Sequence, residues 1–292
     1  MAGCGRIGRL PGAELSDCPV HLFQIAYSEA TRAAIEPGYA MLDNLENARP
    51  DWFEYWPIRR WLAAQPMDPA AWYGFFSPKF GTKTQLGHAQ VVAAVQAAAS
   101  ADPPADVVLF SPQPDMGAFF LNVFEQNELF DPGFIAASEA FLAHVGRPSN
   151  LRALVMDARH VVFSNYFVAR PAFWRAWFEL AERLFAVCEG LDAQAPPGLR
   201  ELLVHPTTYP GAVQRKVFLM ERLASWLLAT ETRWQTQAAN PFTMAWSASR
   251  FREHPLDAVI SDALKLAYRE HGFPHYLSAF AAVRQRFQAA GR

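Results

Sequence analysis

The sequence predicts an α/β protein with a mostly parallel sheet flanked by helices. Short apolar runs rich in β-branched and aromatic residues, such as residues 20–27 and 72–76, have the length and composition of buried strands. Between them lie segments, such as residues 87–99 and 134–145, whose composition or apolar spacing is typical of helices. The alternation continues to about residue 230, and strands that alternate with helices usually form a parallel sheet.

The composition bounds the size and class of the protein. The 292 residues suffice for one large domain with a helical appendage, and 51% of them are hydrophobic, which excludes a disordered chain. The formal net charge is −2, so the basic surface of a nucleic-acid-binding protein is not indicated. Cys4, Cys18 and Cys188 are far apart and form no CxxC pair, which argues against a disulfide framework and a zinc site and fits a reducing cytoplasm.

Three parts can be separated along the chain. Residues 1–19 are rich in glycine and lack a continuous apolar stretch, so we expect a flexible leader rather than a signal peptide. Residues 20–250 should form the main domain, and residues 251–292 a C-terminal helical extension with helices over 257–270 and 276–288. No apolar run reaches the ~18 residues that a membrane-spanning helix needs, and we expect the extension to pack on the domain.

The most informative stretch is residues 161–177. Two short apolar runs flank the polar step Ser164–Asn165, and Pro171 follows at a position where a helix can begin without losing a hydrogen bond. Apolar residues then recur at helical spacing to Cys188, so the stretch predicts a strand, a polar step and a packed helix. The polar step could present hydroxyl and amide groups to a sugar, or Asn165 could simply cap a turn.

The first strand, residues 20–27, ends in a polar Ser-Glu pair. In nucleotide-dependent α/β enzymes, ligands lie at the carboxyl ends of strands. Gln24 and Tyr27 would therefore face a nucleotide in a fold of that kind, whereas in an ordinary buried strand they would have no such role.

A second strand, residues 72–76, leads into Ser77 and a polar, basic loop that contains Lys79 and Lys83. A lysine can neutralise the charge of a diphosphate without a metal ion. The same residues could also be ordinary solvated lysines.

Between these strands, residues 37–65 combine a polar loop with an aromatic helix. Asp51 can cap the helix, and Pro57 should kink or restart it. Tyr55 and Arg59 are spaced to share a helix face, where the arginine would suit either a phosphate or an exposed ion pair.

Residues 105–117 should form another strand that leads to a turn, and residues 233–242 a short edge strand. Asp106 and Asp115 are nine positions apart and therefore form no Asp-x-Asp pair. We expect Asp115 to be structural because it follows a proline in a turn.

Several segments resemble motifs of bacterial GT-A-like glycosyltransferases that build capsule and lipopolysaccharide. The two most specific are SNYFVARPAFWRAWFELAERLF, residues 164–185, and RKVFLMERLASWLLATE, residues 215–231, which occur in the family's order. DNLENARPDWFEYWPIRR (43–60) and the WYGFF strand resemble two further motifs of these proteins. The resemblance implies a GT-A-like, Rossmann-like fold.

The resemblance also implies roles for individual residues. On the donor side it points to Gln24, Tyr27, Asp43, Asn44, Tyr55, Arg59, Ser77, Lys79 and Lys83. On the acceptor side it points to Gln126, Ser164, Asn165 and Arg222. Glu221 would be the catalytic base, because apolar neighbours on its helix should raise the pKa of its carboxyl group, or it could pair with Arg215, Arg222 or another arginine and merely fix the helix. Since Ser77 and Lys79 stand where many GT-A enzymes carry Asp-x-Asp, and the capsule-type proteins that this chain resembles also lack that pair, no metal or other cofactor is expected.

The implied reaction transfers a sugar from a nucleotide-sugar donor to a hydroxyl of a glycan or lipid-linked glycan, in the cytoplasm or at the inner face of the cytoplasmic membrane. One alternative is a catalytically silent glycan-binding or scaffold protein that keeps the fold. Another is a nucleotidyltransferase, against which the lack of a Gly-rich phosphate loop argues. Thermal-shift screening with nucleoside diphosphates would separate an enzyme from a scaffold.

Overall fold

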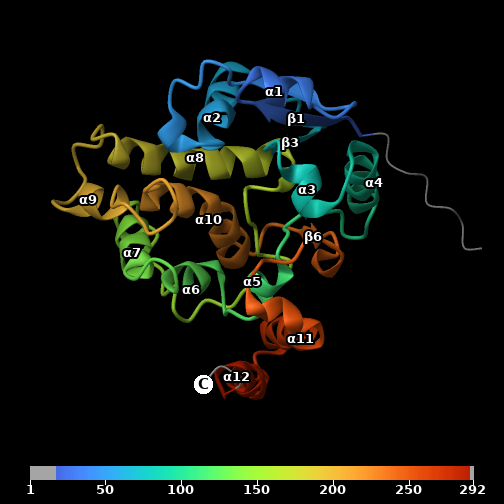
Figure 1. Cartoon of the computed structure of the whole chain (residues 1–292), viewed down its shortest axis with the longest axis vertical. Helices are drawn as coiled ribbons and strands as arrows, with labels where there is room; N and C mark the ends of the chain where they lie inside the picture. The colour runs from blue at the N-terminus through green and yellow to red at the C-terminus, as the bar shows by residue number, and fades with distance from the viewer. Residues whose placement is uncertain (1–17, 290–292) are drawn as a thin grey trace, which may run out of the picture.

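The computed structural model describes residues 18–289, and for residues 287–289 the backbone alone. Nearly all of the expected leader, including Cys4, therefore lies outside the described residues. The described chain forms a mixed sheet flanked by helices, with two helices at its C-terminal end (Figure 1).

The sheet confirms the predicted α/β class and its mostly parallel character. Its strands are β1 (Val20–Ala26), β2 (Ala40–Asp43), β3 (Trp72–Phe76), β4 (Val107–Leu109), β5 (Phe167–Ala169) and β6 (Thr236–Ala238). They lie in the order β2-β1-β3-β5-β4-β6. Strand β5 pairs antiparallel with β3 and β4, and the other neighbours pair in parallel. The edge position of β6 agrees with the prediction.

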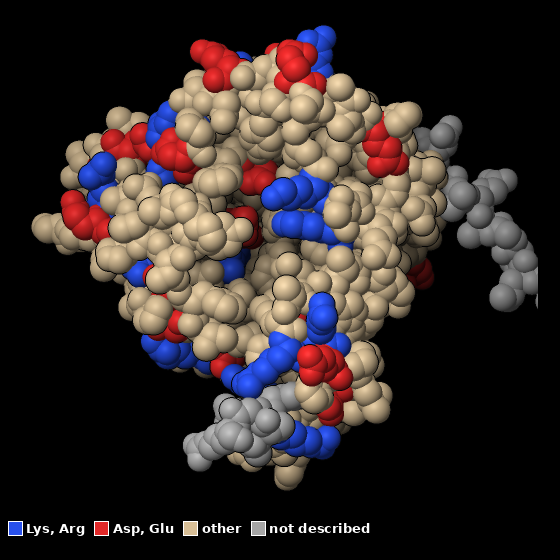
Figure 2. Space-filling model, in the orientation of Figure 1, with Lys and Arg blue, Asp and Glu red and all other residues tan. Residues whose placement is uncertain are grey.

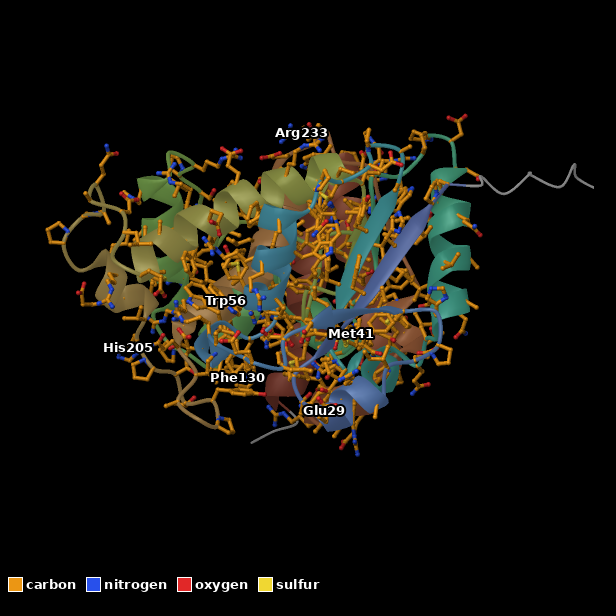
Figure 3. The ribbon with its side chains drawn as sticks, turned by 90° about the horizontal axis from the view of Figure 1, so that it is seen from above. Glu29, Met41, Trp56, Phe130, His205 and Arg233 are labelled. Atoms are coloured by element: carbon orange, nitrogen blue, oxygen red, sulfur yellow. The ribbon has the colours of Figure 1, made fainter. Side chains whose placement is uncertain are left out.

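Side chains alternate between the two faces of the sheet, as the two-residue period of strands requires. Trp72 and Phe76 of β3 join the core beneath helix α4 (His88–Ala99), while Tyr73 and Phe75 join the larger core beneath α2 (Tyr55–Ala64) and α8 (Pro171–Cys188). Figure 3 shows α4 on one side of these strands and α2 and α8 on the other.

Helix α8 begins at Pro171 as predicted, and its buried residues recur at helical spacing. The indole of Trp174 donates a hydrogen bond to the carbonyl oxygen of Tyr73 over 2.9 Å, which ties α8 to β3. The apolar run before the polar step is not a strand, contrary to expectation. Its Val162 and Phe163 N–H groups donate to the hydroxyls of Ser225 and Ser111 instead of to a neighbouring strand.

The remaining helices surround this framework. They are α1 (Glu29–Ala33), α3 (Phe80–Thr84), α5 (Pro114–Ala118), α6 (Val123–Glu128), α7 (Phe134–His144), α9 (Leu199–Leu203), α10 (Arg215–Thr230), α11 (Pro255–His271) and α12 (Pro274–Ala289). Three short 3-10 turns are η1 (Pro50–Trp52), η2 (Pro241–Thr243) and η3 (Arg250–Glu253). The break between α11 and α12 falls at Gly272, whose φ of 72° suits a glycine helix cap.

Three local predictions are wrong for identifiable reasons. Asp51 does not cap a helix, because its carboxylate binds Arg49 and Lys216. Pro57 does not kink α2, because it lies in the first turn, where its missing N–H costs nothing. The basic segment after β3 is not a loop, since residues 80–84 form α3.

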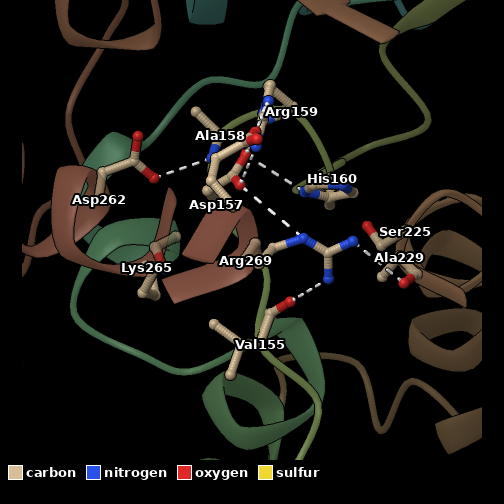
Figure 4. A network of polar contacts seen from close by, with 12 residues as sticks. Val155, Asp157, Ala158, Arg159, His160, Ser225, Ala229, Asp262, Lys265 and Arg269 are labelled. Carbon is tan, nitrogen blue, oxygen red and sulfur yellow. Dashed lines mark hydrogen bonds and ion pairs between the residues drawn. The ribbon is translucent and has the colours of Figure 1, made fainter. Parts of the chain in front are cut away.

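Helix α11 is joined to the domain by a buried polar network (Figure 4). The ammonium group of Lys265 donates to the carbonyl oxygens of Gly117 and Phe120, over 2.7 and 2.9 Å. Asp262 accepts the N–H of Ala158 over 2.8 Å, and Arg269 donates to the carbonyl of Val155. The extension is thus packed against the domain, as expected.

Candidate functional site

The strand directions bring several polar side chains to one edge of the sheet. The carboxyl ends of β1 and β3 lie at this edge. From β1 the chain continues to β2 on one side and later to β3 on the other, so a topological switch point lies between β1 and β3. Because β5 is antiparallel, its amino end lies at the same edge. The hydroxyls of Ser77 after β3 and Tyr166 before β5 are therefore only 2.6 Å apart.

Two lysines of the segment 79–84 border this edge. Lys79 is exposed at the start of α3, and Lys83 is half-buried. The Lys83 ammonium group donates to the Ser164 hydroxyl over 2.9 Å and lies 5.6 Å from the centroid of the Tyr166 ring. The basic segment and the Ser-Asn step, which are far apart in the sequence, thus meet in the structure.

The Ser-Asn step has an unusual backbone. Ser164 and Asn165 have φ angles of 57° and 54°, in the left-handed region that costs energy for residues other than glycine. The Asn165 side chain is buried, and its Oδ1 has no hydrogen-bond partner in the described part of the chain. This oxygen does not cap a turn, and a ligand or a water molecule could satisfy it.

Glu221 lies on α10 with its side chain 24% exposed. Burial raises the pKa of its carboxyl group to about 7, although the Arg222 guanidinium, 3.8 Å away, acts in the opposite direction. The negative charge of Glu54 adds to the increase. The expected increase in the pKa is present, and it gives the carboxyl a protonation equilibrium near neutral pH.

Arg222 and Gln126 have mainly structural partners. The guanidinium group of Arg222 donates to the carbonyls of Val123 and Phe218 and to the Gln126 side chain. These contacts hold α10 against α6. Burial lowers the pKa of Arg222 to about 10, so the guanidinium stays charged at neutral pH. The two side chains support the position of Glu221 but leave little capacity for a sugar.

Sequence reasoning missed Glu54, the residue immediately before α2. Burial raises the pKa of its carboxyl group, and its own backbone N–H, Lys83 and Lys79 only partly offset this. Within residues 18–286 no cation lies within ion-pair distance of this carboxylate. A carboxylate within a run of aromatic residues was the available signal, because such surroundings disfavour a charge unless function requires it.

Tyr27 and Tyr166 lie close enough to these carboxylates for the carboxylate charges to raise the pKa of their hydroxyls. Burial raises the pKa of Tyr27, and the charge of Glu54 contributes to the increase. Burial also raises the pKa of Tyr166, with contributions from both Glu54 and Glu221. The buried Tyr27 hydroxyl has no hydrogen-bond partner among the residues that the structure describes. Tyr27 thus has an unsatisfied hydroxyl close to Glu54, and Tyr166, which the sequence reasoning did not include, lies close to both carboxylates.

Figure 2 shows the surface consequence of this arrangement. The face seen in Figure 1 is hollowed between α3 and α10, with basic side chains over α3 beside the hollow and both acidic and basic side chains within it. The basic border over α3 would suit an anionic group of a ligand.

Tyr55 and Arg59, assigned to the donor pocket, have another role in the structure. The Arg59 guanidinium binds both oxygens of Glu182 on α8, over 2.7 and 2.9 Å, and the Tyr55 hydroxyl donates to the same carboxylate. Arg59 also lies over the Phe185 ring. Both side chains fasten α2 to α8, so we remove them from the site.

Three other donor-side residues make local contacts at the ends of β1 and β2. The Gln24 amide oxygen accepts the Glu36 N–H over 3.0 Å, and the exposed Asp43 accepts the Leu45 N–H. Asn44 is buried, and its Oδ1 lacks a hydrogen-bond partner in the described chain. Of the three, Asn44 alone keeps an unsatisfied group close to the end of β1.

The carboxylates offer little for a metal ion. The described residues contain no group of three or more His, Cys, Asp or Glu side chains that could share one. Asp115 is fully buried at the start of α5, where Ser247 and Ser249 donate to it, which confirms its expected structural role. Asp106 accepts the backbone N–H of Gln235.

A small pocket that is partly open to the surface lies elsewhere, beside α5 and α11. Its volume of about 20 Å³ is enough for a single water molecule. It is lined by Pro112, Val161 and Asp262, among others. Such a cavity cannot accept a substrate, so the open hollow is the better candidate.

Comparisons of the chain with protein-family models, with curated proteins and with solved structures found no match. None of the described helices has the length and apolar character needed to cross a membrane. Function has therefore to be inferred from the residues of the site.

Proposed function

We propose that the protein is a glycosyltransferase with a GT-A-like fold. It would move a sugar from a nucleoside-diphosphate donor to a hydroxyl of a glycan or lipid-linked glycan during the synthesis of cell-surface polysaccharide. The observation that carries the proposal is the environment of Glu221, a half-buried carboxyl whose pKa is raised to about 7 and on which the charge of Lys83, the hydrogen-bond donor to the Ser164 hydroxyl, acts.

The lysines supply the chemistry that the leaving group needs. As the bond between the sugar and the diphosphate breaks, negative charge develops on the leaving phosphate oxygen. Lys79 and Lys83 would stabilise that charge, and the hydrogen bond from Lys83 to Ser164 keeps its ammonium group at the sheet edge. This role does not require the Asp-x-Asp pair that a metal ion would need.

Glu221 supplies the chemistry at the acceptor. Its ionised carboxylate would take the proton of the acceptor hydroxyl while the oxygen forms a bond to the anomeric carbon and the diphosphate leaves. With a pKa of about 7, a large fraction of the carboxyl groups is ionised at neutral pH, and the carboxylate is basic enough to assist the transfer. Attack from the side opposite the leaving group would invert the configuration.

A silent scaffold explains the site less well. Glu54 and Glu221 are two carboxylates whose charged forms are disfavoured by burial, and each raises the free energy of the folded state at neutral pH. A protein that only needs the fold gains nothing from this arrangement, whereas an enzyme gains a base and a binding group.

Glu221→Gln tests the proposal because the substitution keeps the shape and removes the base. We expect kcat to fall by ~10²–10⁴ while the Kd of the donor stays unchanged. Glu201→Gln, at an exposed position of α9, is the matched control and should transfer sugar at the parent rate. Transfer by Glu221→Gln at near the parent rate would remove Glu221 from the mechanism.

A further inference from the structure

We propose that the protein forms a two-fold symmetric dimer in which one exposed side of helix α11 packs antiparallel against the same side of a second copy. This surface lies outside the candidate site, so the dimer does not depend on the proposed activity. Helices α11 and α12 lie at one end of the molecule, away from the sheet, where a second copy can approach α11 (Figure 1).

Two of the three sides of α11 are occupied by other parts of the chain. The side that faces the domain is buried and contains Ala258, Ser261, Asp262 and Lys265. The next side is half-buried, and its Asp257 binds Arg286 of α12 over 3.2 Å. These contacts fix the rotation of α11 about its own axis and therefore determine which residues point to solvent.

The third side of α11 is apolar and exposed. Leu256, Val259 and Leu266 have exposed fractions of 70%, 43% and 38%, and Ala263 between them is also exposed. Spacings of three, four and three residues place these four residues, the α11 stripe, on one line along the helix. Single exposed apolar residues are common, but a line of them at coiled-coil spacing is what a helix presents to another helix.

The α11 stripe is complementary to itself when a second copy lies antiparallel. Leu256 then faces Leu266 of the second copy, and Val259 faces its Ala263, because both pairs are centred on residue 261. The small alanine leaves room for the valine, so every member of the stripe meets an apolar partner. A parallel pair would place Ala263 opposite Ala263 and leave space between the helices.

Charges at the two ends of the stripe favour the same arrangement. Arg252, three residues before α11, is exposed and forms no ion pair with the rest of residues 18–286. Glu270 lies in the last turn of α11 and is 48% exposed, although it binds Arg159 over 2.8 Å. Antiparallel pairing about residue 261 brings Arg252 of each copy toward Glu270 of the other, whereas a parallel pair would bring like charges together.

A membrane surface matches the α11 stripe less well than a second copy does. Helices that lie on membranes combine an apolar side with unpaired lysines and arginines that attract anionic lipids. At this end of the molecule Arg284 and Arg286 of α12 bind Glu125 and Asp257, which neutralises their charges. The acidic Glu270 lies on the line of the stripe itself, where it would oppose contact with anionic lipids.

The length of α11 sets the expected strength of the dimer. Its 17 residues span ~26 Å, and a single pair of such helices lies at the lower end of the interface sizes that specific complexes have. We therefore expect a dimer that dissociates on dilution in the micromolar range.

Sedimentation equilibrium of the full chain from about 1 to about 100 μM tests the dimer. The apparent mass of the wild type should rise with concentration from 32.7 kDa toward twice that value. Leu266→Glu places a charge opposite Leu256 and should raise the dissociation constant at least ~tenfold. Leu202→Glu, at a leucine of α9 that is 46% exposed, is the matched control and should leave the constant unchanged.

Two results would overturn the dimer. One is a wild type that stays monomeric over the whole concentration range, and the other is a dimer that Leu266→Glu leaves unchanged. If Leu266→Glu fails to fold, Val259→Glu takes its place, because it introduces a charge on the same line of α11.

Charge reversal tests the antiparallel orientation. Arg252→Glu would bring two glutamates together and should weaken the dimer, more strongly at low salt than at high salt. Adding Glu270→Arg to the same chain should restore the dissociation constant to within about twofold of the wild-type value. A double variant that dimerises no better than Arg252→Glu would refute the antiparallel register.

Sedimentation with phosphatidylglycerol vesicles distinguishes a second copy from a membrane. We expect the wild type to stay in the supernatant, because its α11 stripe is covered in the dimer. A monomeric wild type that sediments with the vesicles, and a Leu266→Glu variant that does not, would assign the stripe to a lipid surface and overturn the proposal.

Discussion

Replacing Glu221 by glutamine should make the stability of the protein less dependent on pH. In the folded protein the pKa of Glu221 is raised from 4.5 to about 7, mainly by burial. A carboxyl whose pKa is raised on folding contributes stability below its unfolded pKa and loses that contribution as the pH rises through the folded pKa. The pH window of this loss runs from 4.5 to about 7.

The size of the effect follows from the shift. One unit of pKa corresponds to about 1.4 kcal/mol, so the free energy of unfolding of the wild type should fall by about 3 kcal/mol across this window through Glu221 alone. Glutamine does not titrate, and the variant should lack this fall. The other titrating groups are present in both proteins, and because the charges of Glu54 and Glu221 act on each other, the difference between the two curves reports Glu221 together with its coupling to Glu54.

Urea unfolding at several pH values between about 4 and 8 measures the difference directly. We expect the variant to become more stable than the wild type as the pH rises, with the gap levelling off above about pH 7. Glu201→Gln should give a curve parallel to that of the wild type. Parallel curves for Glu221→Gln as well would show that the Glu221 carboxyl is not held in the environment described here.

Three further predictions concern the rest of the site. Lys79→Ala should weaken the binding of a nucleoside diphosphate by ~1–3 kcal/mol in calorimetry, and an unchanged Kd would remove α3 from the phosphate site. Because lysines rather than paired carboxylates would hold the phosphates in the proposed function, sugar transfer should continue in excess EDTA; loss of transfer that manganese restores would contradict this. Glu182→Gln should lower the free energy of unfolding by about 1–2 kcal/mol, through loss of its contacts with Tyr55 and Arg59, and leave donor binding unchanged in the same titration.

The elements of the fold could be predicted because their signals are local. The run of five buried residues in β3, the alanine- and valine-rich α4 and the proline at the start of α8 each identify an element without knowledge of the rest. The direction of β5 could not be predicted in this way. Its orientation depends on pairing with β3 and β4, which are distant in the sequence, and no local pattern records it.

The candidate site was predictable in its residue types and less so in their partners. Spacing placed Tyr55 and Arg59 on one helix face, but the acid that binds them, Glu182, is 123 residues from Arg59. Glu54 was missed for the converse reason. A carboxylate before a helix usually indicates a solvated helix start, and only the packed structure shows that burial raises the pKa of this one and that it forms no ion pair among residues 18–286.

The buried network around α11 makes this helix part of the support of the segment that leads to the Ser-Asn step. The carbonyls of Gly117, Phe120 and Val155 receive their hydrogen bonds from Lys265 and Arg269. Without α11 these oxygens would lose those donors. The loop that α11 holds, at Val155 and Ala158, leads along the chain to the Ser-Asn step. Substitutions in α11 could therefore shift the backbone at the sheet edge without changing the residues that line this edge.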